Sequence, residues 1–215
     1  MRRYKTVIFD LDGTLLDTLE DLTDAVNEAL RCCGFPMRTI EEVRQFVGNG
    51  IYKLMQRAVP DGDVNPDFDK AFGTFKEYYG AHCNDKTRLY PGVKELLLQL
   101  KTQGYHLAIV SNKADFAVKE LQKIYFDGII EVAIGEKEGI RKKPAPDTVM
   151  QALKELGSEK ETAVYVGDSE VDYQTAVNSG MPCISVTWGF RDKEFLIEQG
   201  AKQFAANTEE LAGYL

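Results

Sequence analysis

The sequence has no apolar run of membrane-spanning length. The apolar stretch behind its basic N-terminus is too short for a secretory signal and ends in acids. The sequence also has no excess of positive charge, since 26 Lys and Arg stand against 34 Asp and Glu, for a net charge of −8. Nucleic acids and anionic membranes need a basic footprint, so we expect neither as a partner. A small anionic substrate stays compatible, because it responds to the local field of its pocket.

Cysteine and histidine are scarce, and neither shows the spacing of metal ligands. Cys32 and Cys33 are neighbours in a helical pattern, so their side chains point in different directions. We expect reduced thiols in a cytoplasmic protein. His82 and His106 show no pattern of partners, which favours surface or packing roles over catalysis. Repeats and low-complexity tracts are also missing, and the length suits one sizeable core with a smaller second unit.

Short runs rich in valine and isoleucine alternate with helical patterns along most of the chain. Such runs are typical of strands covered on both faces. Strand–helix alternation implies a parallel sheet with right-handed crossovers. The sequence therefore predicts an α/β fold with a Rossmann-like, parallel, five-stranded sheet. The expected strands are Val7–Phe9, Leu107–Val110, Val132–Ile134, Ala163–Val166 and Ile184–Val186, with helices at Ala114–Ile124, Asp147–Leu156 and Glu170–Ser179.

Residues 17–86 break this alternation, because they show helical patterns and no convincing strand. Thr39-Ile40-Glu41-Glu42 has the spacing of a capping box at a helix N-terminus. The simplest interpretation is a helical cap subdomain, residues 17–86, inserted into a core domain of residues 1–16 and 87–215. Both junctions would lie near the carboxyl edge of the sheet, where a lid could gate water and substrate.

Two carboxylates directly follow the first expected strand, in Asp10-Leu11-Asp12-Gly13-Thr14. Open α/β sheets bind ligands at this carboxyl edge. Residues at i and i+2 of extended backbone lie on the same side, with Cα atoms roughly 6–7 Å apart. Asp10 or Asp12 could attack a phosphorus atom while the other acid handles the leaving oxygen. A polar turn is the alternative, since Asp-Gly is common in turns. A turn, however, does not need an acid directly against an apolar strand.

Two further acids follow the fourth expected strand. Asp168 holds the strand-end position and Asp172 lies one helical turn later. If the first and fourth strands are neighbours, these acids converge with Asp10 and Asp12. Such a cluster raises its own pKa values by repulsion. A hard divalent cation relieves the repulsion, and all-oxygen ligation suits Mg²⁺. The alternative is that Asp168 or Ser169 caps the following helix.

Groups that could hold an anion follow two other strands. Ser111-Asn112-Lys113 offers a hydroxyl and successive N–H groups, which can form a phosphate-binding concavity. Taken alone, this segment is better explained as a helix cap. Arg141-Lys142-Lys143-Pro144 is a basic cluster whose prolines restrict the backbone. We expect Lys143 to hold its ammonium over an anionic site, whereas Arg141 and Lys142 fit a solvated loop.

In order and spacing, these four segments resemble the motifs of the haloacid dehalogenase superfamily of phosphohydrolases. The resemblance covers nearly the whole chain, including the inserted helical cap. It implies that Asp10 is a nucleophile that forms an aspartyl phosphate and that Asp12 is the general acid and base. It also implies Mg²⁺ held by the Asp10 side chain, the Asp12 backbone carbonyl and Asp168, with support from Asp172.

The same resemblance implies that Ser111, the Asn112 backbone and Lys143 bind the transferring phosphoryl oxygens. Phe46–Gly50 and Val186–Arg191 look like segments of phosphoglycolate phosphatases. The implied function is a Mg²⁺-dependent phosphatase acting on a small phosphorylated metabolite, with 2-phosphoglycolate first among the candidates. Four residues of the cap are candidates for binding the substrate, namely Gly48, Asn49, Lys53 and Arg57.

Three other functions share part of this pattern. A phosphosugar mutase similar to β-phosphoglucomutase has all four motifs and differs in how its cap binds the sugar and limits water. A receiver domain of a signalling pathway also phosphorylates a strand-end Asp, but Asp12 and the cap argue against a long-lived phosphate. A haloacid dehalogenase needs no metal and no acid at the position of Asp12.

Overall fold

The computed structural model describes residues 3–215 and divides into two compact units. One unit is Asp17–Arg88, and the other is the chain up to Leu16 together with Leu89–Leu215. Each unit has a hydrophobic core of its own. The unit that includes Leu89–Leu215 contains the six-stranded sheet and the candidate site.

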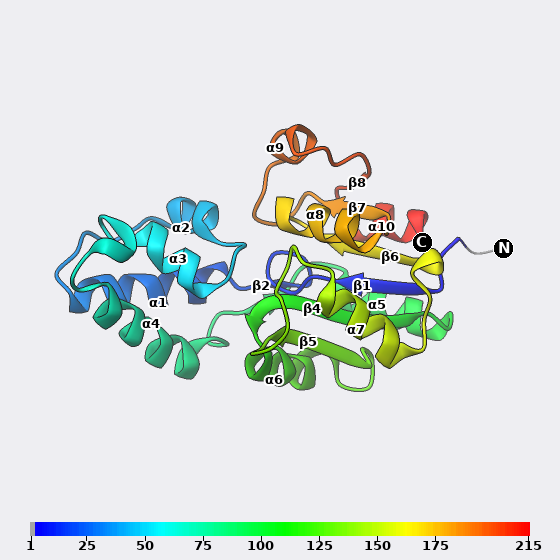
Figure 1. Ribbon diagram of the computed structural model, residues 1–215. Coiled ribbons are helices and arrows are strands. Elements are labelled where there is room, and N and C mark those ends of the chain that lie inside the picture. Colours follow the sequence, from blue (N-terminus) through cyan, green and yellow to red (C-terminus); the bar gives the residue numbers. More distant parts are fainter. Residues whose placement is uncertain (1–2) are drawn as a thin grey trace. The chain divides into compact units, whose positions relative to one another are not determined.

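Within the described residues, six parallel strands form one sheet in the order β5-β4-β1-β6-β7-β8 (Figure 1). Strand β1 is central, and its Phe9 aligns with Ile109 of β4 and Val166 of β6. The residues that follow these three strands therefore emerge at one edge. The strands are β1 (Thr6–Phe9), β4 (His106–Ala114), β5 (Val132–Glu136), β6 (Ala163–Gly167), β7 (Cys183–Val186) and β8 (Phe204–Ala205).

The five expected strands are all confirmed, but the prediction of five strands in the sheet is wrong by one. Strand β8 is only two residues long, so it carries no run from which a strand could be predicted. Strand β4 also extends beyond its apolar run, because Ala114 still aligns with Glu136 of β5 after a register shift. Ser111–Lys113 therefore lie in the end of the strand and not in a strand-to-helix turn.

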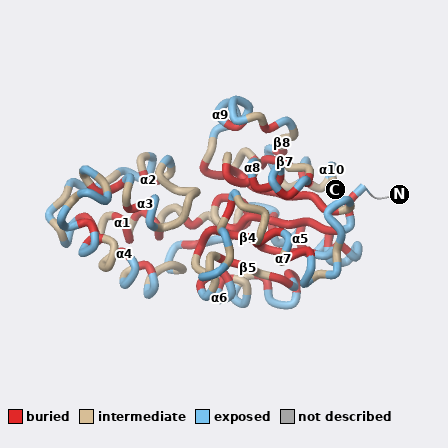
Figure 2. Tube along the Cα trace, viewed as in Figure 1, coloured by how far each residue is buried: buried red, intermediate tan, exposed pale blue. Residues whose placement is uncertain are grey.

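The helices of this unit cover both faces of the sheet. In β1, Val7 and Phe9 pack into a core with α5, α6 and α10, whereas Ile8 faces a second core with α7 and α8. Figure 2 shows the strands as a buried layer between helices that are partly exposed. The bounds are α5 (Val93–Thr102), α6 (Asp115–Phe126), α7 (Asp147–Leu156), α8 (Glu170–Ser179), α9 (Lys193–Glu198) and α10 (Thr208–Tyr214), with a 3₁₀ turn η2 (Lys160–Thr162).

The unit Asp17–Arg88 consists mainly of helices packed around one apolar core. The predicted capping box is present, since Thr39 Oγ1 accepts from the Glu42 N–H and the Glu42 carboxylate accepts from the Thr39 N–H. Buried Asp21 accepts bonds from the N–H and hydroxyl of Thr87, which ties the end of the unit to its first helix. The elements are α1 (Leu19–Cys32), α2 (Ile40–Phe46), α3 (Ile51–Ala58), η1 (Gly62–Val64) and α4 (Phe68–His82).

Two short strands, β2 (Leu16–Asp17) and β3 (Arg88–Leu89), pair with each other where the chain passes between the units. None of the helices within residues 3–215 is both long enough and apolar enough to cross a membrane.

Candidate active site

Three buried carboxylates meet at the carboxyl edge of the sheet. Asp10 follows β1, Asp168 follows β6, and Asp172 lies in the first turn of α8. Each offers one oxygen, and these oxygens lie within 4.8 Å of one another. Because β1 and β6 are neighbours, the condition that the sequence set for convergence is met. The Asp12 carboxylate contacts a different partner, described below.

Asp10 is held at the strand end by its own backbone and side chain. Its N–H donates to the Val166 carbonyl at 2.9 Å, continuing the pairing with β6. Its Oδ1 accepts from the Leu11 N–H at 2.7 Å and lies 2.8 Å from Lys143 Nζ. Burial, with repulsion from Asp172, raises the pKa of Asp10 well above its ordinary value, although Lys143 opposes the shift. The Lys143 ammonium is therefore the group that favours an ionised Asp10.

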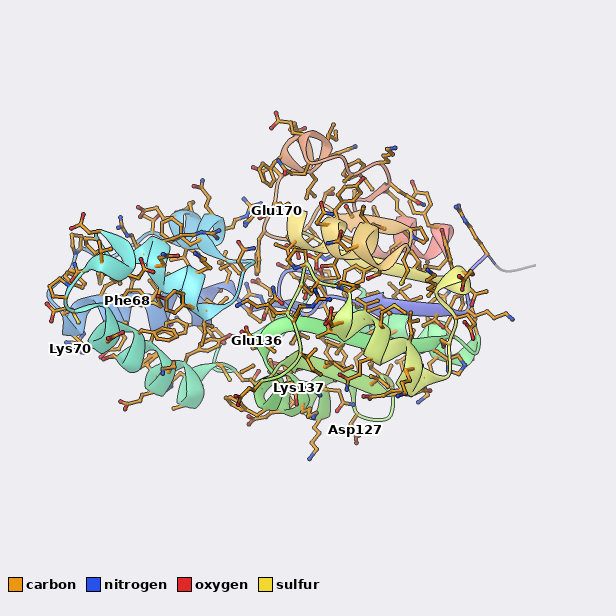
Figure 3. All side chains as sticks on the ribbon, in the orientation of Figure 1. Phe68, Lys70, Asp127, Glu136, Lys137 and Glu170 are labelled. Carbon is orange, nitrogen blue, oxygen red and sulfur yellow. The ribbon has the colours of Figure 1, made fainter. Side chains whose placement is uncertain are left out.

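Lys143 reaches the acids from the loop before α7. Its Nζ lies 2.8 Å from Asp172 Oδ1 as well as from Asp10, and 3.1 Å from the Tyr165 hydroxyl. Burial disfavours its charge, but attraction to Asp10 and Asp172 outweighs burial and raises the pKa of Lys143. Lys142 instead pairs with Glu136 (labelled in Figure 3), with 39% of its side chain exposed. Only the second of these adjacent lysines reaches the carboxylate cluster.

Both oxygens of Asp172 are occupied by protein donors. Oδ1 accepts from Lys143 and Tyr165, and Oδ2 accepts from the Ser169 N–H at 3.1 Å and hydroxyl at 2.5 Å. Ser169 and Asp172 thereby form a capping box at the start of α8. Burial alone would raise the pKa of Asp172, but Lys143 and Ser169 outweigh burial and lower it. Asp172 is thus an anion that holds Lys143 in place and caps a helix.

Asp168 is oriented by two donors from distant parts of the chain. Oδ1 accepts from the Thr14 hydroxyl at 3.0 Å and Oδ2 from the Phe190 N–H at 2.7 Å. The neighbouring Trp188 donates from its indole to the Thr14 carbonyl at 3.0 Å. Burial and repulsion from Asp172 raise the pKa of Asp168 to about 7. A carboxylate destabilised in this way gains from a nearby cation.

These donors suit an oxygen-ligated divalent cation. Asp10 and Asp168 each carry lone pairs beyond the bonds described above. Their repulsion is of the kind that a cation relieves, and carboxylate ligands suit Mg²⁺ or Mn²⁺. Asp172 has both oxygens bonded to protein donors, so it fits the outer part of such a centre, where it would orient Lys143.

Three glycines to which the sequence analysis gave no role allow this cluster to pack. A Cβ at Gly13 would lie 2.8 Å from Asp168 Cγ, and a Cβ at Gly167 would lie 2.8 Å from Asp172 Oδ2. A Cβ at Gly189 would lie 2.5 Å from Asp168 Cγ and would also overlap the Gly13 carbonyl. Only glycine fits at these positions without moving the acids.

Gly189→Ala should therefore weaken Mg²⁺ binding. The added methyl group pushes on Asp168, and displaced metal-site residues typically cost 10–100-fold in affinity, so we expect a loss of about 10-fold or more in calorimetric titrations with Mg²⁺. Gly213→Ala in α10 is the matched control, since its Cβ meets nothing within 4 Å. Equal Mg²⁺ affinity in the two variants would contradict a metal site at Asp168.

Ser111 and Asn112 lie in the extended end of β4, and both are buried. Ser111 Oγ accepts from the Lys113 N–H at 3.2 Å, and Asn112 Nδ2 donates to the Lys143 carbonyl at 3.1 Å. Asn112 Oδ1 is buried without a donor in the part of the chain that the structure describes. Asn112 thus links the end of β4 to the loop that carries Lys143.

Lys113 is a charged residue of this site to which the sequence interpretation gave no role. Its Nζ lies 2.9 Å from Asp12 Oδ1, and only 3% of its side chain is exposed. The signal was in the sequence, because Lys113 follows Ser111 by two residues. In extended backbone that spacing puts both side chains on the same side. Interpreting the segment as a helix cap hid this relation.

Gly48 and Asn49 lie in the helical unit, in the loop between α2 and α3. Arg57 of α3 binds their loop, donating to the Phe46 carbonyl at 2.6 Å and to Asn49 Oδ1 at 2.7 Å. Lys53 donates to Gln56 at 2.6 Å. Within this unit, Arg57 therefore contacts the loop that contains Gly48 and Asn49.

Comparison with known proteins identifies the family and the fold of the chain. A family model described as haloacid dehalogenase-like hydrolase matches residues 7–186. Phosphoglycolate phosphatase 1 of Pseudomonas aeruginosa is 34% identical over 216 residues, covering 98% of this chain and 79% of that protein. A solved structure from Lactobacillus delbrueckii subsp. bulgaricus, provisionally named a phosphoglycolate phosphatase, has a TM-score of 0.95 at 38% identity, covering 100% of this chain and 99% of its own. CbbY from Rhodobacter sphaeroides, solved in complex with phosphate, has a TM-score of 0.78 at 27% identity, covering 97% and 96%.

Proposed function

The chain belongs to the haloacid dehalogenase-like hydrolases and hydrolyses phosphoric monoesters, and from this premise we propose that its substrate is 2-phosphoglycolate. The relatives named phosphoglycolate phosphatase support the substrate. The observation that carries the chemistry is the buried Asp10, with the Lys143 ammonium 2.8 Å from its Oδ1 and the Asp168 carboxylate beside it. A buried carboxylate with a fixed cation is suited to attack a phosphate dianion.

In the first step, an oxygen of Asp10 forms a bond to phosphorus as the ester P–O bond breaks. Asp12 donates a proton to the leaving alkoxide, which departs as an alcohol. In the second step, Asp12 takes a proton from water as the water oxygen attacks phosphorus. The bond between Asp10 and phosphorus breaks, and inorganic phosphate leaves. Lys143, the Ser111 hydroxyl and the Asn112 N–H stabilise charge on the transferring oxygens.

Mg²⁺ would be held by the Asp10 side chain, the Asp12 backbone carbonyl and Asp168. It would supply positive charge to the phosphoryl oxygens. Asp172 orients Lys143 at the same time, since their charged atoms are 2.8 Å apart. Together these charges let a protein of net charge −8 accept a dianion.

The required rate acceleration shows why several groups must cooperate. Phosphate-monoester hydrolysis can need a rate acceleration of up to about 10²¹-fold, which lowers the barrier by about 29 kcal/mol at 1.36 kcal/mol per factor of ten. Removing one preorganised donor from an active site typically costs about 2.7–4 kcal/mol. A nucleophile, a proton donor, a fixed lysine and a metal must therefore act on the same phosphoryl group.

A panel of phosphomonoesters with Mg²⁺ tests the substrate. We expect the highest kcat/KM for 2-phosphoglycolate, measured by phosphate release. EDTA should abolish activity, and excess Mg²⁺ should restore it, because the acids lose their cation. β-Glucose 1-phosphate belongs in the panel, and its conversion to glucose 6-phosphate without free phosphate would identify a mutase instead. A higher kcat/KM for another ester would agree with phosphatase activity but would contradict 2-phosphoglycolate as the substrate.

A further inference from the structure

The ammonium of Lys113 is buried against Asp12 on the edge of the cluster described above. Nζ lies 2.9 Å from Asp12 Oδ1, and 3% of the lysine side chain and 17% of the aspartate side chain are exposed. A lysine is almost never buried to this degree unless it is paired. Lys143 serves a different pair of acids, Asp10 and Asp172. The two lysines are therefore not interchangeable.

The neighbouring strand fixes the backbone that carries Lys113. A Cβ at Gly135 of β5 would lie 2.6 Å from the Lys113 carbonyl oxygen and 2.5 Å from Asp115 Cα, so the two segments are in close contact. The Gly135 N–H donates to Asp115 Oδ1 at 2.9 Å. Within β4, the Lys113 N–H donates to Ser111 Oγ at 3.2 Å. These contacts leave the long side chain anchored at its base and directed at Asp12.

We propose that Lys113 is the positioning residue of Asp12: its ammonium binds Oδ1 of the Asp12 carboxyl group, and this contact orients the other oxygen, which carries the proton in the first step, toward the leaving oxygen of the substrate. This proposal rests on the proposed function, in which Asp12 transfers a proton to that oxygen. A charge-assisted bond of 2.9 Å limits the directions in which the carboxylate can turn. Misplacing a catalytic group by about 1 Å can cost about 10²-fold in rate.

The leaving group of the substrate reveals this role. An alkyl phosphate loses a strongly basic alkoxide, which needs the proton from a well-placed acid. p-Nitrophenyl phosphate loses a weakly basic phenolate, which departs without that proton. A residue that positions Asp12 should therefore matter for alkyl esters and matter little for the aryl ester. The ratio kcat/KM is the quantity to compare, because it reports the steps up to loss of the leaving group.

The experiment measures Lys113→Met with 2-phosphoglycolate, ethyl phosphate and p-nitrophenyl phosphate, all with Mg²⁺ present. We expect kcat/KM to fall by about 10²-fold for both alkyl esters and by less than about threefold for the aryl ester. Lys113→Arg should recover part of the loss. Lys142→Met is the matched control, since Lys142 pairs with half-exposed Glu136, and it should behave as wild type.

Other patterns would overturn the proposal. An equal loss for all three esters would show that Lys113 binds the transferring phosphoryl group or supports the fold. A loss confined to 2-phosphoglycolate would show that Lys113 binds the substrate carboxylate, since ethyl phosphate has none. Failure of the proposed function looks different, because wild type would then prefer an ester other than 2-phosphoglycolate. The comparison of ethyl phosphate with p-nitrophenyl phosphate tests the positioning role of Lys113 whether or not 2-phosphoglycolate is the substrate.

A double-mutant cycle supplies a second test. With Asp12→Ala as background, Lys113→Met should change kcat/KM for p-nitrophenyl phosphate and ethyl phosphate by less than about twofold, because its target is gone. If Lys113→Met lowered kcat/KM as much in the Asp12→Ala background as in wild type, Lys113 would act independently of Asp12. Thermal unfolding of all four proteins checks that each of them is folded.

Discussion

Replacing Asp10 with asparagine should remove at least about 10⁴-fold of kcat for every phosphomonoester, because a carboxamide is a far poorer nucleophile toward phosphorus. The shape of the side chain hardly changes, and its carbonyl oxygen can still accept from the Leu11 N–H. Lys143 keeps its second carboxylate, Asp172, at 2.8 Å. The fold should survive, with a thermal midpoint close to that of wild type.

The loss should coincide with the loss of a covalent intermediate. Wild type mixed with ³²P-labelled substrate and quenched in acid should carry alkali-labile label, and Asp10→Asn should carry none. Asp127→Asn is the control, since this exposed acid at the end of α6 (labelled in Figure 3) lies outside the cluster. An Asp10→Asn protein that still turns over with Mg²⁺ would exclude the aspartyl-phosphate mechanism.

Much of the α/β unit could be predicted because its signals are local. Val7–Phe9 and Ala163–Val166 are short apolar runs, and burial on both faces is what such runs require. Once these strands are parallel neighbours, Asp10 and Asp168 must share one edge of the sheet. The parallel direction of the strands followed from strand–helix alternation. The adjacency of β1 and β6 did not, so the convergence of the acids stayed conditional until the strand order was known.

The parts that could not be predicted depend on contacts between distant segments. Strand β8 has two residues, and its place depends on pairing with β7. The extended end of β4 depends on the close approach of Gly135, which nothing near Ser111 in the sequence signals. The need for glycine at position 189 arises from Asp168, 21 residues away in the chain. Propensity and periodicity describe single segments, so they do not detect such constraints.

Replacing Lys143 with methionine should cost about 10³-fold in kcat/KM and also destabilise the protein. The activity falls because the transferring oxygens lose a fixed positive charge. The stability falls because Asp10 and Asp172 are left buried without their shared cation, and breaking a buried ion pair typically costs about 3–5 kcal/mol. Phosphate release and urea unfolding measure the two effects. Lys142→Met is the matched control, with little change expected in either measurement, because its ion pair is half-exposed.

A second substitution separates the two roles of Lys143. Asp172→Asn in the Lys143→Met protein removes one of the stranded charges, so stability should partly return. Activity should not return, because no ammonium faces the phosphoryl group. If activity instead recovered with stability, Lys143 would act on the reaction only by holding the fold together. If Lys142→Met lost more activity than Lys143→Met, the phosphate-binding role would belong to Lys142, against the 2.8 Å contact between Lys143 and Asp10.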